Sequence, residues 1–250
     1  MLTAPTAPVQ FRLGTPPPGS LRRGCFINRQ KAGDHMGADV KCEIRNLDDL
    51  LKKIKGNKKN AEKMMKRLTS DARKRVPGWV ATEVTKVYGV KKGEITGKKL
   101  GTMTIRGNTF KALKFHYSGR LLTPTHFGMS PTAPKPGGGY TLKATFIKGQ
   151  RTTMGKVKKL SQKQRKVLAK NFSRSGTQNS DHSPIMLMRA NGGHYLPFQR
   201  VSARRNDIEA IKTISLPQMV SNEKTKEPIH TAINDGLQKR IDHYASMFNK

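Results

Sequence analysis

Apolar residues recur every three or four positions between Leu47 and Ala72, and the opposite face of this segment is rich in lysine. Such a stripe predicts an amphipathic helix. Asn46 is a suitable N-cap, and the nearby Asp48 and Asp49 complement the positive end of a helix. Proline lacks the backbone N–H that a helix interior needs, so Pro77 is expected to end this helix or to start the next one.

A second helical pattern runs through residues 79–88, with Gly89 as its C-terminal stop. Apolar and polar residues then alternate in three segments, which predicts half-buried strands with a polar, basic face. These strands are expected within residues 101–107, 110–117 and 140–149. The intervening residues 118–139 are rich in Pro, Gly and Thr, and so long a loop is usually functional or mobile.

The last third of the chain combines a short basic helix, a hairpin and a long helix. The helix is expected at residues 161–172, and a polar loop follows at 173–183. Asn191, Gly192 and Gly193 supply a tight turn for a hairpin at 184–202, and Pro197 places its second arm at an edge or bulge. Pro228 suits the first turn of the final helix. That helix carries one apolar stripe, made of Ile229, Ile233, Leu237, Ile241, Tyr244 and Phe248.

The predicted order is helices, then antiparallel strands, then a helix, and it contains no alternating βαβ units. This order predicts an α+β fold. It comprises N-terminal helices, a central antiparallel β-sheet with a long loop, and a C-terminal helix. Residues 36–250 are expected to form a single domain. Residues 1–35 are rich in Pro and Gly and show no sustained periodicity. We expect them to be disordered or a mis-called extension, with translation beginning at Met36.

The net charge of the chain indicates what kind of partner it has. It carries 49 Lys and Arg against 16 Asp and Glu, a formal net charge of +33. A charge of this size indicates a polyanionic neighbourhood, which is nucleic acid, an acidic protein or a membrane surface. No run approaches the roughly 18 apolar residues of a membrane span. Two cysteines, Cys25 and Cys42, are too few for a disulfide framework.

Residues 95–180 contain no Asp or Glu, although 18 of these 86 residues are Lys or Arg. Compositional drift is the plain alternative, but mixed signs would keep a surface soluble without building a field of one sign. We therefore predict contact with DNA or with an acidic neighbouring subunit through a basic segment. Its residues are Lys156, Lys158, Lys159, Lys163, Arg165, Lys166 and Lys170.

Catalytic patterns are missing from the sequence. The stretch GEITGKKLGT, residues 93–102, resembles a phosphate-binding loop, but Gly93 and Gly97 are one residue too close and Lys99 replaces the Ser or Thr. Its flanks are also reversed, with a predicted helix before it and a strand after it. The seven histidines are scattered without zinc spacing. We expect no enzyme activity, no cofactor and no metal.

Residues 45–248 resemble the minor tail protein Z family of long-tailed phages. The resemblance rests on the order and spacing of several phrases, and residues 1–35 fall outside it. The phrases are LDDLLKKI, a helix closing on VYGV, TIRG, FKALKFHYS, YTLKATFIKG, PIMLMR, YLPFQRVSA, SLPQMV and LQKRIDHYASMF.

The resemblance implies a virion structural protein of the tail-completion or head–tail-joining type, without catalytic residues. It implies other tail or neck proteins as partners, and a homo-oligomeric ring for which ring-forming relatives suggest six copies. The virion is the expected location, with the host cytoplasm during assembly. A basic subunit could flank the DNA channel through phosphate contacts without reading sequence. The alternative is a sequence-nonspecific nucleic-acid-binding accessory protein, although no RNA-binding aromatic motif, helix-turn-helix or zinc knuckle is present.

Overall fold

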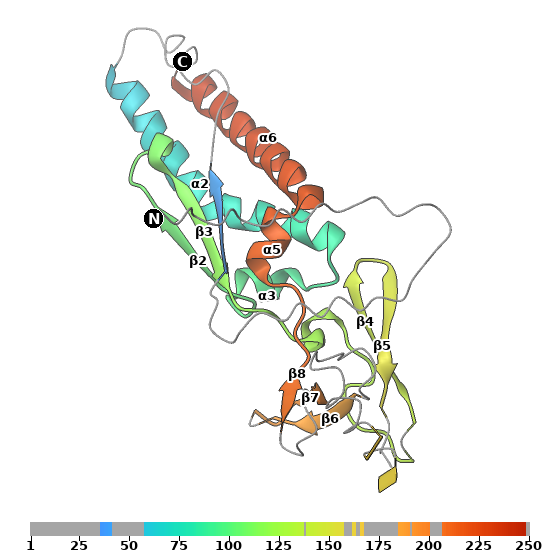
Figure 1. Ribbon diagram of the computed structural model, residues 1–250. Coiled ribbons are helices and arrows are strands. Elements are labelled where there is room, and N and C mark those ends of the chain that lie inside the picture. Colours follow the sequence, from blue (N-terminus) through green and yellow to red (C-terminus); the bar gives the residue numbers. More distant parts are fainter. Residues whose placement is uncertain are drawn as a thin grey trace, which may run out of the picture.

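The computed structural model combines two long helices with three small antiparallel sheets (Figure 1). It describes residues 36–41, 58–137, 139–157, 162–163, 166–167, 185–190, 192–200 and 207–248. The helices are α2 (Lys58–Val87), α3 (Lys92–Thr96), α5 (Leu216–Ser221) and α6 (Glu223–Phe248), with 3-10 turns η1 (Phe110–Ala112) and η2 (Pro124–Phe127). The strands are β1 (Met36–Lys41), β2 (Thr102–Arg106), β3 (Lys114–Gly119), β4 (Thr141–Ile147), β5 (Gln150–Lys156), β6 (Met186–Arg189), β7 (Tyr195–Arg200) and β8 (Ile208–Ala210). The predicted α+β class is confirmed.

The first sheet has the order β1-β3-β2 and is antiparallel throughout. β1 pairs with a strand more than seventy residues further along the chain, and α2 lies between the two in sequence. The predicted strand at β2 is confirmed, and the one predicted at residues 110–117 is confirmed from Lys114 on, because its first residues form η1; β1 was not predicted. Ala38 and Val40, both buried, alternate with exposed residues in β1, but a six-residue strand gives too short a pattern to recognise.

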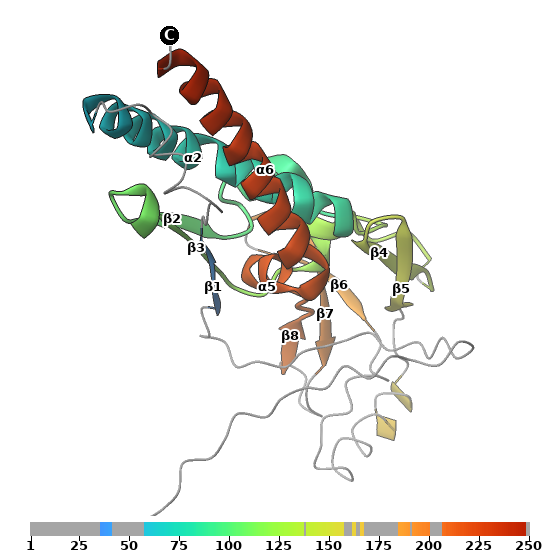
Figure 2. The same ribbon diagram turned by 90° about the horizontal axis from the view of Figure 1, so that it is seen from above.

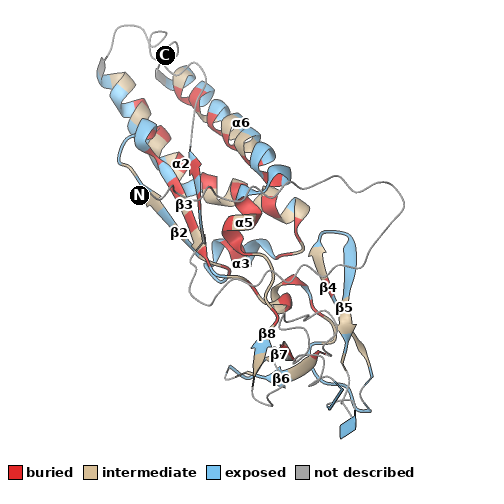
Figure 3. Cartoon of the chain, in the orientation of Figure 1, coloured by how far each residue is buried: buried red, intermediate tan, exposed pale blue. Residues whose placement is uncertain are grey.

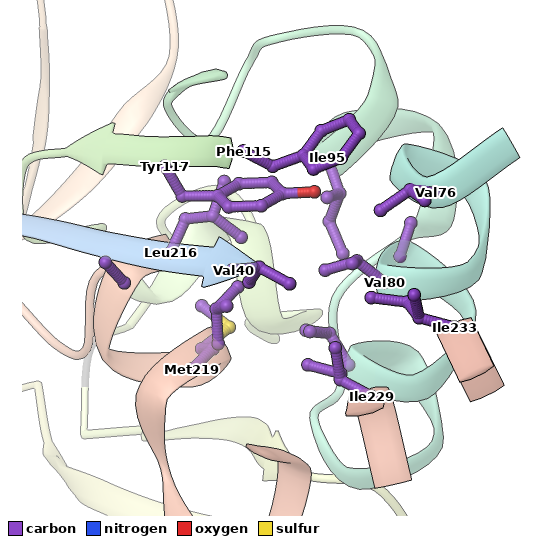
Figure 4. Close-up of a cluster of buried hydrophobic side chains, with 14 of the residues drawn as sticks. Val40, Val76, Val80, Ile95, Phe115, Tyr117, Leu216, Met219, Ile229 and Ile233 are labelled. Atoms are coloured by element: carbon purple, nitrogen blue, oxygen red, sulfur yellow. The ribbon is translucent and has the colours of Figure 1, made fainter. Parts of the chain in front are cut away.

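The main core lies between this sheet and the helices (Figure 4). Val40, Phe115 and Tyr117 project from the sheet toward valines of α2 and isoleucines of α6. α5 packs against β1 and β3, and α2 and α6 lie side by side (Figures 1 and 2). Burial of this apolar surface is the dominant stabilising contribution, at roughly 25 cal/mol per Å² removed from water.

Helix α2 continues through Pro77, so the predicted break at this residue is wrong. Proline within a helix costs about 3 kcal/mol. The neighbouring Val76 and Val80 are both fully buried and hold the helix against the core on either side of the proline. The two predicted helices therefore form one element from Lys58 to Val87. The predicted start at Asn46 lies outside the described residues.

The second sheet is the β4–β5 hairpin, which is bound to the end of α2. Gly89 N donates to Phe146 O at 3.1 Å, and Lys148 N donates to Val87 O at 2.8 Å. A Cβ at Gly89 would lie 1.9 Å from the Thr145 carbonyl oxygen, so glycine is required here for close approach. β5 was not predicted, because its sequence QRTTMGK lacks a regular apolar alternation.

The third sheet has the order β6-β7-β8, and its first two strands are the predicted hairpin. The predicted edge position of Pro197 is wrong, because β7 is the central strand. Pro197 pairs with Leu187 of β6, while the β7–β8 ladder begins only at Phe198. Pro197 O accepts from Ile211 N at 2.8 Å, but proline has no N–H to donate in return, and the β7–β8 ladder ends beside it.

The predicted loop at residues 118–139 begins within β3, which extends to Gly119, and its middle part packs against the core. Phe127 is fully buried, and Met129 is 3% exposed. Ser130 forms backbone hydrogen bonds with Lys143 of β4 in both directions, and Leu122 N donates to Ile214 O. These contacts connect the first sheet, the hairpin and the segment that leads into α5.

The C-terminal helix is interrupted at Asn222, which separates α5 from α6. Ser215 caps α5 through a reciprocal pair of hydrogen bonds with Gln218. Pro228 is the sixth residue of α6, so its predicted place in the first turn is wrong. The predicted apolar stripe is confirmed for its first five members, and the burial of Phe248 lies outside the description. These five are Ile229, Ile233, Leu237, Ile241 and Tyr244.

Two close contacts hold α6 against α2. A Cβ at Gly236 would lie 2.6 Å from the Trp79 ring, so the helices meet closely at this glycine. Nearer the end of α6, Arg240 Nε donates to Asp71 Oδ2 at 2.5 Å, and Tyr244 Oη donates to the same oxygen at 2.8 Å.

Among the described helices, none combines the length and the hydropathy that a bilayer crossing requires.

Candidate nucleic-acid interface

The predicted basic segment is only partly described. Lys156 ends β5 opposite Thr141 and is exposed, and Lys163 and Lys166 are exposed and helical. Lys158, Lys159, Arg165 and Lys170 lie outside the described residues. The predicted helix at 161–172 agrees with the structure at four positions, which are 162, 163, 166 and 167. The three described lysines are on the surface, as contact with a polyanion requires.

Within residues 95–157, every described Lys and Arg is exposed (Figure 3). The β4–β5 hairpin displays several of these side chains, and its turn is drawn in pale blue. Gly149, at φ 80°, allows the tight turn that exposes Lys148. The exposed cations of the hairpin are Lys143, Lys148, Arg151 and Lys156.

A second basic surface covers the outer face of the β1-β3-β2 sheet, and the sequence predicted only the polar, basic faces of β2 and β3 within it. Strand alternation places Phe115 and Tyr117 inward and Lys114 and His116 outward. The register brings Lys41 of β1 and Arg106 of β2 to either side of Lys114. All three side chains are exposed. We call Lys41, Lys114 and Arg106 the cation row.

The adjacent row on this face contains Asp39, His116 and Thr104. His116 Nδ1 donates to Asp39 Oδ1 across 2.6 Å. A Cβ at Gly37 would lie 2.8 Å from the His116 ring, so this glycine leaves room for the imidazole. The hydrogen bond from His116 lowers the pKa of the Asp39 carboxyl below its ordinary value, and the charges of Lys114 and Arg106 act in the same direction.

Like charges directly opposite each other on a sheet destabilise it. The cation row contains two such contacts in succession, Lys41 with Lys114 and Lys114 with Arg106. Asp39 is the one carboxylate among the described residues of β1, β2 and β3. The repulsion between these side chains is unfavourable in the free protein. The attraction of a nearby anion to the same side chains would offset it.

The loop at residues 93–102 does not form a phosphate cradle. Its first residues belong to α3, and β2 follows after a turn in which Lys98 has φ 61°. The predicted order of helix before strand is confirmed, although α3 replaces part of the predicted loop. Glu94 is engaged with His126 of η2, with its Oε2 3.1 Å from Nδ1. The described residues contain no group of three or more potential metal ligands.

The cation row left a faint signal in the sequence. Arg106 and Lys114 are separated by the β2–β3 connection and occupy the polar positions of two predicted strands. Lys41 is remote in sequence and belongs to a strand that was not recognised. Alternation alone could have placed two of the cations on one polar face, but the third required the β1–β3 register.

Comparison of the chain with family models, with curated proteins and with solved structures found no match.

Proposed function

We propose that this chain is a virion structural protein of a phage tail, acts in tail completion or head–tail joining, and flanks the DNA channel. The observation that supports this most is the exposure of every described Lys and Arg in the acid-free stretch. Such a surface suits a phosphate backbone that is contacted without sequence readout. The layout of the sequence, which resembles the minor tail protein Z family, supplies the virion context.

The geometry also suits an assembled part. The β1-β3-β2 sheet has β1 and β2 as its edge strands, and β5 provides a further edge, whereas the outer edge of β4 is occupied by Gly89 and Ser130. Edge strands present backbone groups that can pair with a neighbouring subunit. We propose a homo-oligomeric ring, built by head-to-tail contacts around the channel, with other tail or neck proteins as neighbours. In this proposal the protein needs no cofactor and catalyses no reaction.

The decisive experiment is removal of the gene from the phage that encodes it. Electron microscopy of the resulting particles should show heads and tails that are poorly joined, or joined particles that do not infect. Re-supplying the protein in trans should restore infectivity. A normal yield of infectious particles from the deletion would contradict the proposal.

A sequence-nonspecific nucleic-acid-binding accessory protein fits the same charge. Mass spectrometry of purified wild-type particles separates the two functions, because a structural component remains in the virion at a fixed copy number. An accessory factor would be depleted from purified particles while still binding DNA in the lysate.

A further inference from the structure

We propose that the outer face of the β1-β3-β2 sheet is a binding surface for the phosphodiester backbone of duplex DNA, with the cation row as its centre. The inference rests on the proposed function in its choice of DNA as the polyanion. It adds a surface distinct in sequence from the basic segment at 156–170. It also assigns contacts to residues of three strands, Lys41, Arg106 and Lys114.

The spacing of the row suits a nucleic-acid strand. Neighbouring strands of a sheet lie about 4.8 Å apart, so the row extends roughly 10 Å from Lys41 to Arg106. One strand of duplex DNA carries a charge about every 3.4 Å along its axis. Measured along the helix axis, the length of the row corresponds to about three phosphates of one strand. Long, exposed Lys and Arg side chains can adjust to their positions without a preformed pocket.

Charge complementarity selects the partner. The row consists of cations placed directly opposite one another, which an ordinary solvated sheet face avoids by alternating signs. Asp39 lies beside the row but is hydrogen-bonded to His116, and its carboxylate neutralises only part of the positive charge. Thr104 and Ser118 provide neutral hydroxyl groups on the same face. An extended anion can form favourable electrostatic contacts with all three cations at once.

The arrangement predicts opposite effects on stability and on binding. Replacing the central lysine, Lys114→Gln, removes both repulsive contacts and should raise the melting temperature by about 1–3 °C. The same change should weaken DNA binding. A residue that merely supports the fold would lower stability when it is replaced, so this pairing of signs is specific to a binding role.

The test measures duplex DNA binding against salt for four proteins. They are the wild type, Lys41→Gln/Arg106→Gln/Lys114→Gln, Lys156→Gln/Lys163→Gln/Lys166→Gln, and the control Lys224→Gln/Lys226→Gln/Lys239→Gln. The control removes three exposed cations from α6, so the change in net charge is matched. Loss of three phosphate contacts should reduce the slope of log affinity against log salt by up to roughly 2.7 in the row variant. The control should change it by less than about 1.

The outcomes separate this inference from the proposed function. A row variant that behaves as the control does, while the 156–166 variant loses affinity, overturns the inference and leaves DNA contact by the basic segment. Wild-type protein that binds polyglutamate or anionic lipid vesicles but not duplex DNA overturns DNA contact by both surfaces. If the triple row variant does not fold, the Lys114→Gln protein decides alone, and unchanged DNA affinity in it contradicts the inference.

Discussion

The two faces of the β1-β3-β2 sheet show opposite chemistry within a few ångströms. On β3, Phe115 is fully buried against the helices, whereas Lys114 is exposed on the other side. The inner face is shielded from water by α2, α5 and α6 (Figure 4). The outer face carries the cation row. Within this sheet, the charged side chains therefore lie on the face that packing leaves uncovered.

The C-terminal helix α6 and the β4–β5 hairpin differ in charge, because α6 carries as many acids as Lys and Arg residues and the hairpin carries Lys and Arg alone. On α2 and α6, acids lie beside bases, as in the pairs Asp71–Arg240 and Glu83–Lys86. On the β4–β5 hairpin there is no acid at all, and on the first sheet Asp39 is alone. The acid-free hairpin and the outer face of the first sheet are the surfaces on which we propose that DNA binds.

The largest expected effect comes from the inner face. Phe115→Ala should lower the free energy of unfolding by about 3–5 kcal/mol, because it leaves a cavity in the main core. Lys114→Gln, one residue away, should not lower it. Urea denaturation of both proteins measures the contrast. Equal destabilisation by the two changes would show that the faces are not energetically distinct.

The contact between the helices should give the next largest effect. Gly236→Ala should destabilise the protein by about 1–3 kcal/mol, because the new methyl group collides with the Trp79 ring. The matched control is Gly93→Ala, since a Cβ there meets nothing within 4 Å. Thermal unfolding measures both variants. Equal stability of the two variants would contradict the close contact between Gly236 and the Trp79 ring.

The helix ion pair predicts a pH dependence. Burial by itself would raise the pKa of Asp71, but the hydrogen bonds from Tyr244 and Arg240 lower it below its ordinary value. A lowered folded pKa contributes stability that is present above the unfolded value, near 3.9, and is lost as pH falls through the folded value. Asp71→Asn should therefore cost about 1–3 kcal/mol at pH 7 and progressively less below about pH 4.

Urea titrations of the wild type and Asp71→Asn between pH 7 and pH 2.5 measure this difference. Asp242→Asn is the control, because that exposed carboxylate accepts a hydrogen bond only from Gln238 of the same helix among the described residues. A difference between wild type and Asp71→Asn that stays constant across this range would contradict the role of the Asp71 charge.

The smallest effect should come from the one acid on the outer face. Asp39→Asn removes the carboxylate beside the cation row and should strengthen binding to duplex DNA by up to roughly five-fold at low salt. The gain should vanish at high salt because exposed charges are screened. Fluorescence anisotropy at two salt concentrations measures it. Unchanged or weaker binding at low salt would argue against an anion on this face.

Local patterns predicted much of the fold. Alternation identified β2 with its partly buried residues and β3 and β4 with buried ones, and four-residue spacing identified the stripe of α6. The prolines were the main source of error. Pro77, Pro197 and Pro228 each occupy an interior position of an element, because burial of neighbouring side chains or the end of a ladder compensates for the missing donor.

The residues of the cation row also differ in how far the sequence alone could place them. Side-chain period alone determined that Arg106 and Lys114 point away from the apolar side of their strands, since successive residues alternate between faces. Only the tertiary structure decided that Lys41 lies beside them, because strand pairing is a contact between segments far apart in sequence. A register shifted by one residue would turn Lys41 toward the core. The free energy of burying Val40 and Ala38 selects the observed register, and the cation row is its consequence.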